Sequence, residues 1–189
     1  MHIAVFSGFL PETHSMSMEF FAWPYMELFF GEEAGKYRYM HALDALSFIP
    51  YGTMVDHFQH IVYENPDMTP EKRNQAWLEL EKLYRPHISM EGIPFIQEGR
   101  RWQYQMHIFE SPFYYIDYCL AQTAAFRFLI SSREDYAQAF SKYMALSKQG
   151  GEALWTELLA QAGFPSPFSP GALGDLARDI ESLLKAIAV

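Results

Sequence analysis

Residues 12–31 read ETHSMSMEFFAWPYMELFFG, and this stretch carries two glutamates seven positions apart. Seven residues at about 100° each return to within about 20° of the starting direction, so Glu12 and Glu19 share one helical face. The pattern predicts a helix that begins near Glu12, is kinked or broken at Pro24 and stops at Gly31. Two interpretations remain open: two glutamates on a partly buried surface helix, or a metal-binding carboxylate with a second carboxylate behind it.

Helix start and stop signals recur along the whole chain, whereas alternating strand patterns with tight hairpin turns are absent. The clearest start signal is Thr69-Pro70, where threonine can cap the helix and proline takes the first helical position. The sequence therefore predicts an all-α fold, a multi-helix domain that spans residues 1–189 as a single domain. The other expected helices cover about residues 34–47, 52–64, 70–84, 98–107, 112–130, 132–149, 152–162 and 173–186.

Composition restricts the class of protein. Half of the 189 residues are hydrophobic and 17% are aromatic, which predicts a buried core and excludes a disordered chain. The net charge of −9 argues against a nucleic-acid partner, because such binding depends on clustered Lys and Arg. Cys119 is the only cysteine, and the N-terminus MHIAVFSGFL lacks a basic segment and a long apolar run. We therefore expect a cytoplasmic protein with no membrane span and no export signal.

The stretch at residues 12–31 resembles part of the oligoendopeptidase F branch of the thimet-type zinc metallopeptidases. In that family the pattern E-x-x-S-x-x-x-E supplies the third zinc ligand from its first glutamate. The resemblance continues through FIPYGTMVDHFQHIVYENPDMTPEKRN, through HISMEGIPFIQEGRRWQYQMHIFESPFYYIDYCLAQ and to GFPSPF, so it covers about residues 12–168. It implies the C-terminal helical half of a catalytic domain whose complete relatives hydrolyse short peptides.

The resemblance also implies roles for particular residues. Glu12 matches the zinc ligand, and Glu19 matches the glutamate that holds a histidine ligand by a hydrogen bond. His107, Tyr114 and Tyr118 match the groups that stabilise the oxyanion formed when metal-bound water attacks a peptide bond. Tyr115 is the next candidate among the tyrosines. From the residues alone, a helix rich in tyrosine is more often part of a core.

The H-E-x-x-H motif, which carries two zinc ligands and the general base in this family, is not found in the 189 residues. The seven histidines are followed by Ile, Ser, Ala, Phe, Ile, Ile and Ile, and His2 carries little weight as a remnant of the motif. The sequence therefore predicts a truncated, metallopeptidase-like chain that binds no zinc stably and cleaves no peptide alone. A substitute metal site at His57, His60 and Glu64 is the weaker alternative.

Three functional hypotheses follow from the sequence. The first is a partial zinc metallo-oligopeptidase, a hydrolase of short peptides when complete. The second is a non-enzymatic helical interaction protein that self-associates as a homo-oligomer through its exposed cleft wall. The third is complementation by a separate N-terminal half that carries the missing motif.

Overall fold

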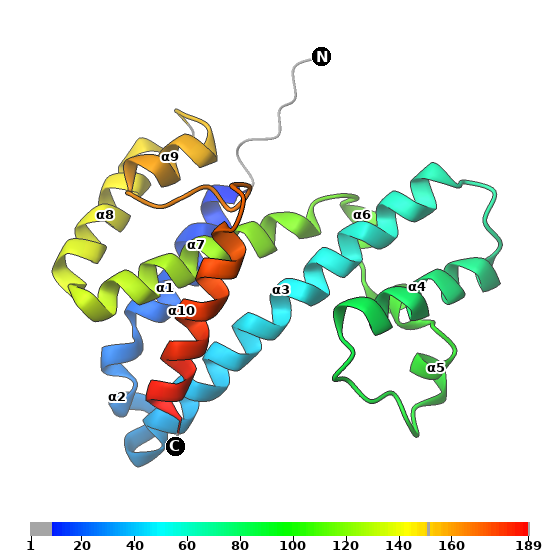
Figure 1. Cartoon of the computed structure of the whole chain (residues 1–189), viewed down its shortest axis with the longest axis horizontal. Helices are drawn as coiled ribbons and strands as arrows, with labels where there is room; N and C mark the ends of the chain where they lie inside the picture. The colour runs from blue at the N-terminus through cyan, green and yellow to red at the C-terminus, as the bar shows by residue number, and fades with distance from the viewer. Residues whose placement is uncertain (1–8, 151, 189) are drawn as a thin grey trace. The chain divides into compact units, whose positions relative to one another are not determined.

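A computed structural model describes residues 9–150 and 152–188, and every regular element in these ranges is helical (Figure 1). The all-α prediction is therefore confirmed for the described residues. No helix among them is long and apolar enough to cross a bilayer. The α-helices are α1 (Phe9–Phe21), α2 (Glu27–Phe30), α3 (Ala34–Glu64), α4 (Pro70–Tyr84), α5 (Pro94–Gln97), α6 (His107–Glu110), α7 (Tyr115–Glu134), α8 (Tyr136–Gln149), α9 (Trp155–Gln161) and α10 (Ala172–Ile187), and the short 3-10 helices are η1 (Trp23–Tyr25), η2 (Gly31–Glu33) and η3 (Arg101–Tyr104).

Contacts divide the chain into two compact units. Unit 1 contains residues 1–46 and 120–189, and unit 2 contains residues 47–119. Helices α3 and α7 each begin in one unit and end in the other, because the boundaries fall inside both helices.

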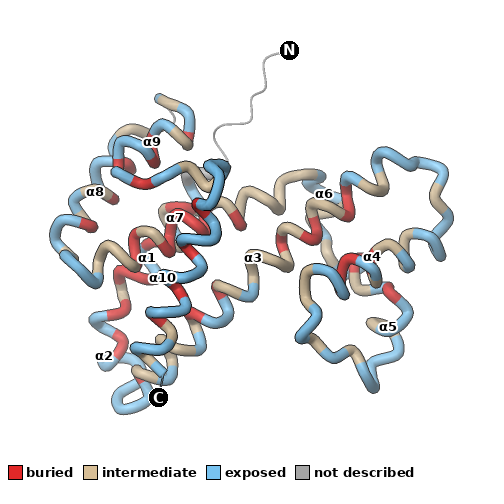
Figure 2. Tube along the Cα trace, viewed as in Figure 1, coloured by how far each residue is buried: buried red, intermediate tan, exposed pale blue. Residues whose placement is uncertain are grey.

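Unit 1 is organised around the buried part of α7. Residues 121–126 are all buried, and Phe128 and Leu129 extend this run (red in Figure 2). Helix α1 packs against α8, and α8 packs against α9. The cluster that joins α1, α7, α8 and α9 contains eleven buried residues: Phe21, Ala124, Phe128, Ala139, Tyr143, Leu146, Trp155, Leu158, Leu159, Ala162 and Phe164.

Unit 2 has a smaller core with two tryptophans. The buried hydrophobic residues of this core come from α3, α4 and η3: Met54, Val55, Phe58, Trp77, Leu80 and Trp102. Trp102 donates its indole N–H to Asn74 Oδ1 at 2.9 Å, which ties η3 to α4. The Thr69 side chain accepts a hydrogen bond from the Lys72 N–H, so the predicted cap of α4 is confirmed.

The break expected between residues 47 and 52 is wrong, because α3 runs without interruption through Pro50. A proline inside a helix removes one backbone hydrogen bond and costs about 3 kcal/mol. Met54, Val55 and Phe58 lie just beyond it and are at most 1% exposed. Each such side chain gains about 2 kcal/mol on burial, so continuing the helix outweighs the cost of the proline.

The helix expected over residues 98–107 is also wrong, because this segment contains η3 and the start of α6. Gly99 has φ of +73°, and a Cβ at this position would lie 2.2 Å from the Asn74 carbonyl oxygen. The chain therefore leaves the helical region at Gly99 in order to pass close to α4.

Helix α7 begins at Tyr115 rather than at Pro112, because Phe113 adopts a positive φ of 63°. The Phe113 N–H donates to Gln59 Oε1 at 2.8 Å, and its ring packs 4.9 Å from the rings of His60 and Tyr63. These contacts with α3 hold an unfavourable backbone conformation that local sequence does not predict.

Candidate functional site

Glu12 and Glu19 both lie on α1, in unit 1. Glu12 stands in the first turn of the helix, and its side chain is partly exposed, whereas Glu19 is 59% exposed. The opposite face is anchored by Thr13 and Ser17, both fully buried, and Trp155 donates its indole N–H to Thr13 Oγ1 at 3.2 Å. Local sequence thus fixes which face of α1 carries the two carboxylates.

Glu19 contacts a histidine that no sequence motif marks. His41 Nε2 lies 3.1 Å from Glu19 Oε2, and the Trp23 indole N–H lies 2.9 Å from His41 Nδ1. An indole nitrogen can only donate, so His41 Nδ1 is the acceptor and Nε2–H donates to the carboxylate. His41 also stacks on Phe20 at 4.9 Å. Glu19 is therefore already paired with a histidine within unit 1.

His107 and the tyrosine set lie together in unit 2. The ring centroid of His107 is 4.8 Å from that of Tyr115 and 5.8 Å from that of Tyr118, and Tyr114 lies 5.2 Å from Tyr118. His107 Nδ1 is 2.9 Å from Gln105 Nε2. The fold therefore gathers one imidazole and three phenols at the junction of α6 and α7, with Tyr115 nearest to the histidine.

Burial controls the proton of Tyr115. Desolvation raises the pKa of Tyr115 to about 12, and the nearby Tyr51 acts in the same direction, whereas a hydrogen bond from Gln105 lowers the pKa by a smaller amount. Tyr115 therefore stays a neutral phenol at physiological pH. A neutral phenol beside an imidazole can donate a hydrogen bond to developing negative charge.

A catalytic zinc ion is held by three protein ligands and a water molecule. The part of the chain described here contains no group of three or more His, Cys, Asp or Glu side chains that could hold a metal ion. The described residues alone therefore do not fit such an ion, and Glu12 supplies at most one of its ligands. His2 lies outside the described residues.

The alternative metal site on α3 is not assembled in the structure. His57 Nδ1 lies 3.0 Å from the Tyr84 hydroxyl, and His60 Nε2 lies 3.4 Å from Asp56 Oδ2. His57, His60 and Glu64 form no metal-binding group among the described side chains. The two imidazoles take part in contacts within unit 2.

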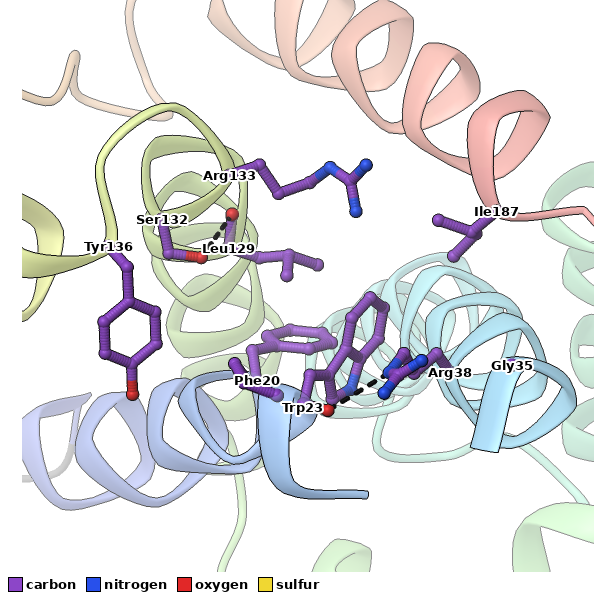
Figure 3. A pocket seen from close by; sticks show the side chains of 10 residues that line it. Phe20, Trp23, Gly35, Arg38, Leu129, Ser132, Arg133, Tyr136 and Ile187 are labelled. Atoms are coloured by element: carbon purple, nitrogen blue, oxygen red, sulfur yellow. Dashed lines mark hydrogen bonds between the residues drawn. The ribbon is translucent and has the colours of Figure 1, made fainter. Parts of the chain in front are cut away.

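A pocket of about 350 Å³ opens in unit 1, and Figure 3 shows its lining. It is lined by Phe20, Trp23, Pro24, Gly35, Arg38, Leu129, Ser132, Arg133, Tyr136 and Ile187. Most of its polar groups already have partners: Arg38 donates to the Trp23 carbonyl and to Glu27, and Ser132 donates to the Leu129 carbonyl. The pocket contains none of the site residues that the sequence predicts.

Sequence patterns do not identify His41 and Tyr51 as neighbours of the candidate site. His41 lies 22 residues from Glu19, and Tyr51 lies 54 residues from Gln105, with which it shares a hydrogen bond of 2.8 Å. Residues this far apart in sequence share no helical spacing that could predict a contact. Both pairs form because α3 packs against α1 at His41 and against the segment that contains Gln105 at Tyr51.

The chain is similar in sequence and structure to known proteins. A search with protein-family models finds no match, and a search of curated proteins finds no match either. Among solved structures, PZ peptidase A with an inhibitor is 48% identical with a TM-score of 0.91, and the match covers 96% of this chain and 32% of that chain.

Two further structures are assigned as oligoendopeptidase F. One is 50% identical with a TM-score of 0.91, covering 95% of this chain and 32% of its own. The other, from Bacillus anthracis str. Ames, is 43% identical with a TM-score of 0.79, covering 95% of this chain and 29% of its own. The chain thus spans about a third of the length of the solved structures that it matches.

Proposed function

We propose that this chain, which belongs to the oligoendopeptidase F family, forms one wall of the site at which a peptidase hydrolyses short peptides. The observation that carries the proposal is its 43% to 50% identity with three peptidase structures over 95% to 96% of its length. A match over 95% to 96% of the chain extends across both units. The whole enzyme's activity and its zinc ion are part of this proposal.

Each group has a distinct role in the proposed site. Glu12 offers a carboxylate from the first turn of α1, and Glu19 orients a neighbouring imidazole. His107 and the phenols of Tyr114 and Tyr118 donate hydrogen bonds to the oxyanion of the tetrahedral intermediate, and Tyr115 beside His107 is the next candidate. Neutral donors suit this task, since they stabilise negative charge without losing a proton.

The first test is peptide cleavage by the purified chain. We expect a quenched fluorescent oligopeptide to stay intact in the presence of stoichiometric zinc, because the described residues supply too few ligands. Cleavage that is abolished by a chelator and by Glu12→Ala would contradict this expectation. Glu33→Ala serves as the matched control, because Glu33 is exposed and lies outside the proposed site.

The second test supplies the missing motif on a separate polypeptide taken from a solved relative. We expect cleavage to appear on mixing, and we expect His107→Ala to lower kcat about 100-fold with KM little changed, because one oxyanion donor is lost. Glu12→Gln should abolish the restored activity. Unchanged rates in both variants would exclude these residues from the site.

A second candidate function is self-association without catalysis. It is favoured by adjacent apolar side chains on α2, where Leu28 is 81% exposed and Phe29 is 74% exposed. If this surface mediates a homo-oligomer, light scattering will show a mass above that of one chain, and Leu28→Ser with Phe29→Ser will restore the monomer. A monomer at high concentration would contradict this function.

A further inference from the structure

The side-chain amide of Gln105 connects a partly buried tyrosine to His107, entirely within unit 2. The Tyr51 hydroxyl lies 2.8 Å from Gln105 Oε1, and Gln105 Nε2 lies 2.9 Å from His107 Nδ1. Both ends of the amide are therefore engaged at hydrogen-bond distance. Which nitrogen of His107 carries the proton depends on which end of the amide faces it.

The orientation of the amide is set on the tyrosine side. The guanidinium carbons of Arg85 and Arg101 lie 5.1 and 5.0 Å from the Tyr51 ring centroid, and the 1% exposed Glu81 carboxylate lies 3.2 Å from Arg85 and 3.9 Å from Arg101. Burial raises the pKa of Tyr51, and the positive charge of Arg101 partly opposes that rise. The hydroxyl of Tyr51 therefore keeps its proton and donates it to Gln105 Oε1 at 2.8 Å.

The other end of the amide faces the histidine. Because Oε1 accepts the Tyr51 proton, the NH₂ end of Gln105 is the end that lies 2.9 Å from His107 Nδ1. An amide nitrogen can only donate, so Nδ1 of neutral His107 is the acceptor.

We propose that Gln105 is a positioning residue that keeps Nδ1 of neutral His107 as a hydrogen-bond acceptor, so that the ring proton stays on Nε2. The Nε2–H group is then available as a donor, as an oxyanion site requires. With the amide reversed, Nδ1 would hold the proton and Nε2 would offer a lone pair that repels an oxyanion. The use of this donor in peptide hydrolysis rests on the proposed function, whereas the tautomer does not.

The tautomer can be read directly by NMR. In ¹⁵N-labelled chain at neutral pH, long-range ¹H–¹⁵N correlation separates protonated from bare imidazole nitrogens, and the spectrum of His107→Asn assigns the His107 signals. We expect Nδ1 of His107 to be bare and Nε2 to be protonated. In Gln105→Glu, an isosteric carboxylate that only accepts, we expect Nδ1 of His107 to become protonated.

The matched control is Gln103→Glu, which introduces the same charge at an exposed position two residues away and should leave both nitrogens unchanged. Tyr51→Phe keeps the ring but removes the hydroxyl, and should weaken the preference for Nε2–H. The proposal is overturned if Nδ1 of the unmodified chain is protonated, or if it stays bare in a folded Gln105→Glu variant. No peptidase activity enters this experiment, so its outcome is independent of the cleavage tests.

Discussion

At the scale of single residues, two imidazoles in separate units are oriented by the same device. Trp23 donates to Nδ1 of His41, and Gln105 donates to Nδ1 of His107, so each ring keeps its Nε2–H. His41 directs that proton to Glu19. A hydrogen-bond donor at Nδ1 fixes the tautomer of a neutral histidine, so that its Nε2–H becomes a defined donor.

His14 is different, because burial rather than a partner governs its proton. Its Nε2 atom is buried with no hydrogen-bond partner among the described residues, and its ring contacts Tyr143 edge-on at 5.8 Å. Burial lowers the pKa of His14 below its ordinary value of 6.5. The folded protein therefore binds a proton at His14 less readily than the unfolded chain does.

This shift predicts a loss of stability on acidification. Well above pH 6.5 His14 is neutral in both states and contributes no pH dependence. As pH falls below that value the unfolded chain gains a proton first, so the free energy of unfolding decreases. Urea titrations should show a smaller decrease for His14→Gln, whereas exposed His87→Gln serves as the control. Equal pH dependence in all three proteins would contradict the assignment to His14.

At the scale of elements, α3 and α7 approach closely within unit 2 at one glycine. A Cβ at Gly52 would lie 2.2 Å from the Cys119 sulfur, so only glycine leaves room for that side chain. The thiol is buried, its pKa is raised to about 12 by desolvation, and it lies 3.5 Å from the Ile49 carbonyl. Cys119 thus serves as a packing residue at a helix contact.

We expect Gly52→Ala to lower the free energy of unfolding by about 2 kcal/mol, because the added methyl group forces the sulfur or a helix to move. Cys119→Ala introduced in the same chain should recover part of this loss, and a double-mutant cycle by chemical denaturation measures the coupling.

Gly174 is the matched control, because a Cβ there meets only the Arg178 guanidinium at 3.7 Å. Gly174→Ala on α10 should raise stability by about 0.5 kcal/mol through its helix propensity. Destabilisation of similar size at both glycines would show that the Gly52 effect does not arise from the contact with Cys119.

At the scale of the whole molecule, the two units share two helices. Residues of α3 and α7 lie on both sides of each boundary, so melting one unit removes helical neighbours from the other. We therefore expect the chain to behave as the single domain that the sequence predicts. Calorimetry should give one transition whose calorimetric and van't Hoff enthalpies agree.

Glu81→Leu provides the decisive variant for this expectation. It leaves the partly buried guanidinium groups of Arg85 and Arg101 without their carboxylate and should cost about 2 kcal/mol, since charge-assisted hydrogen bonds are lost. In one cooperative domain the whole transition moves to lower temperature. Two resolved transitions, of which only one moves, would mean that the units unfold independently.

Much of the fold follows from the sequence, because the signals are local. Thr69 caps α4, Pro24 interrupts the first helical stretch, and Gly150 follows the end of α8 with a positive φ of 54°. Each of these residues acts through its own backbone or its nearest neighbours in the chain. The shared face of Glu12 and Glu19 belongs to the same class, since helical spacing alone fixes it.

The tertiary structure decided the features that depend on distant partners. The helix through Pro50 persists because buried side chains beyond it outweigh one lost hydrogen bond, and the Gly99 turn exists because α4 lies close by. The same holds for the link from Tyr51 through Gln105 to His107, in which 54 residues separate the first two partners. Local sequence determines the backbone torsions that each residue prefers and the face on which apolar side chains lie. Packing between distant segments decides where such a local preference is overridden and which polar groups form contacts.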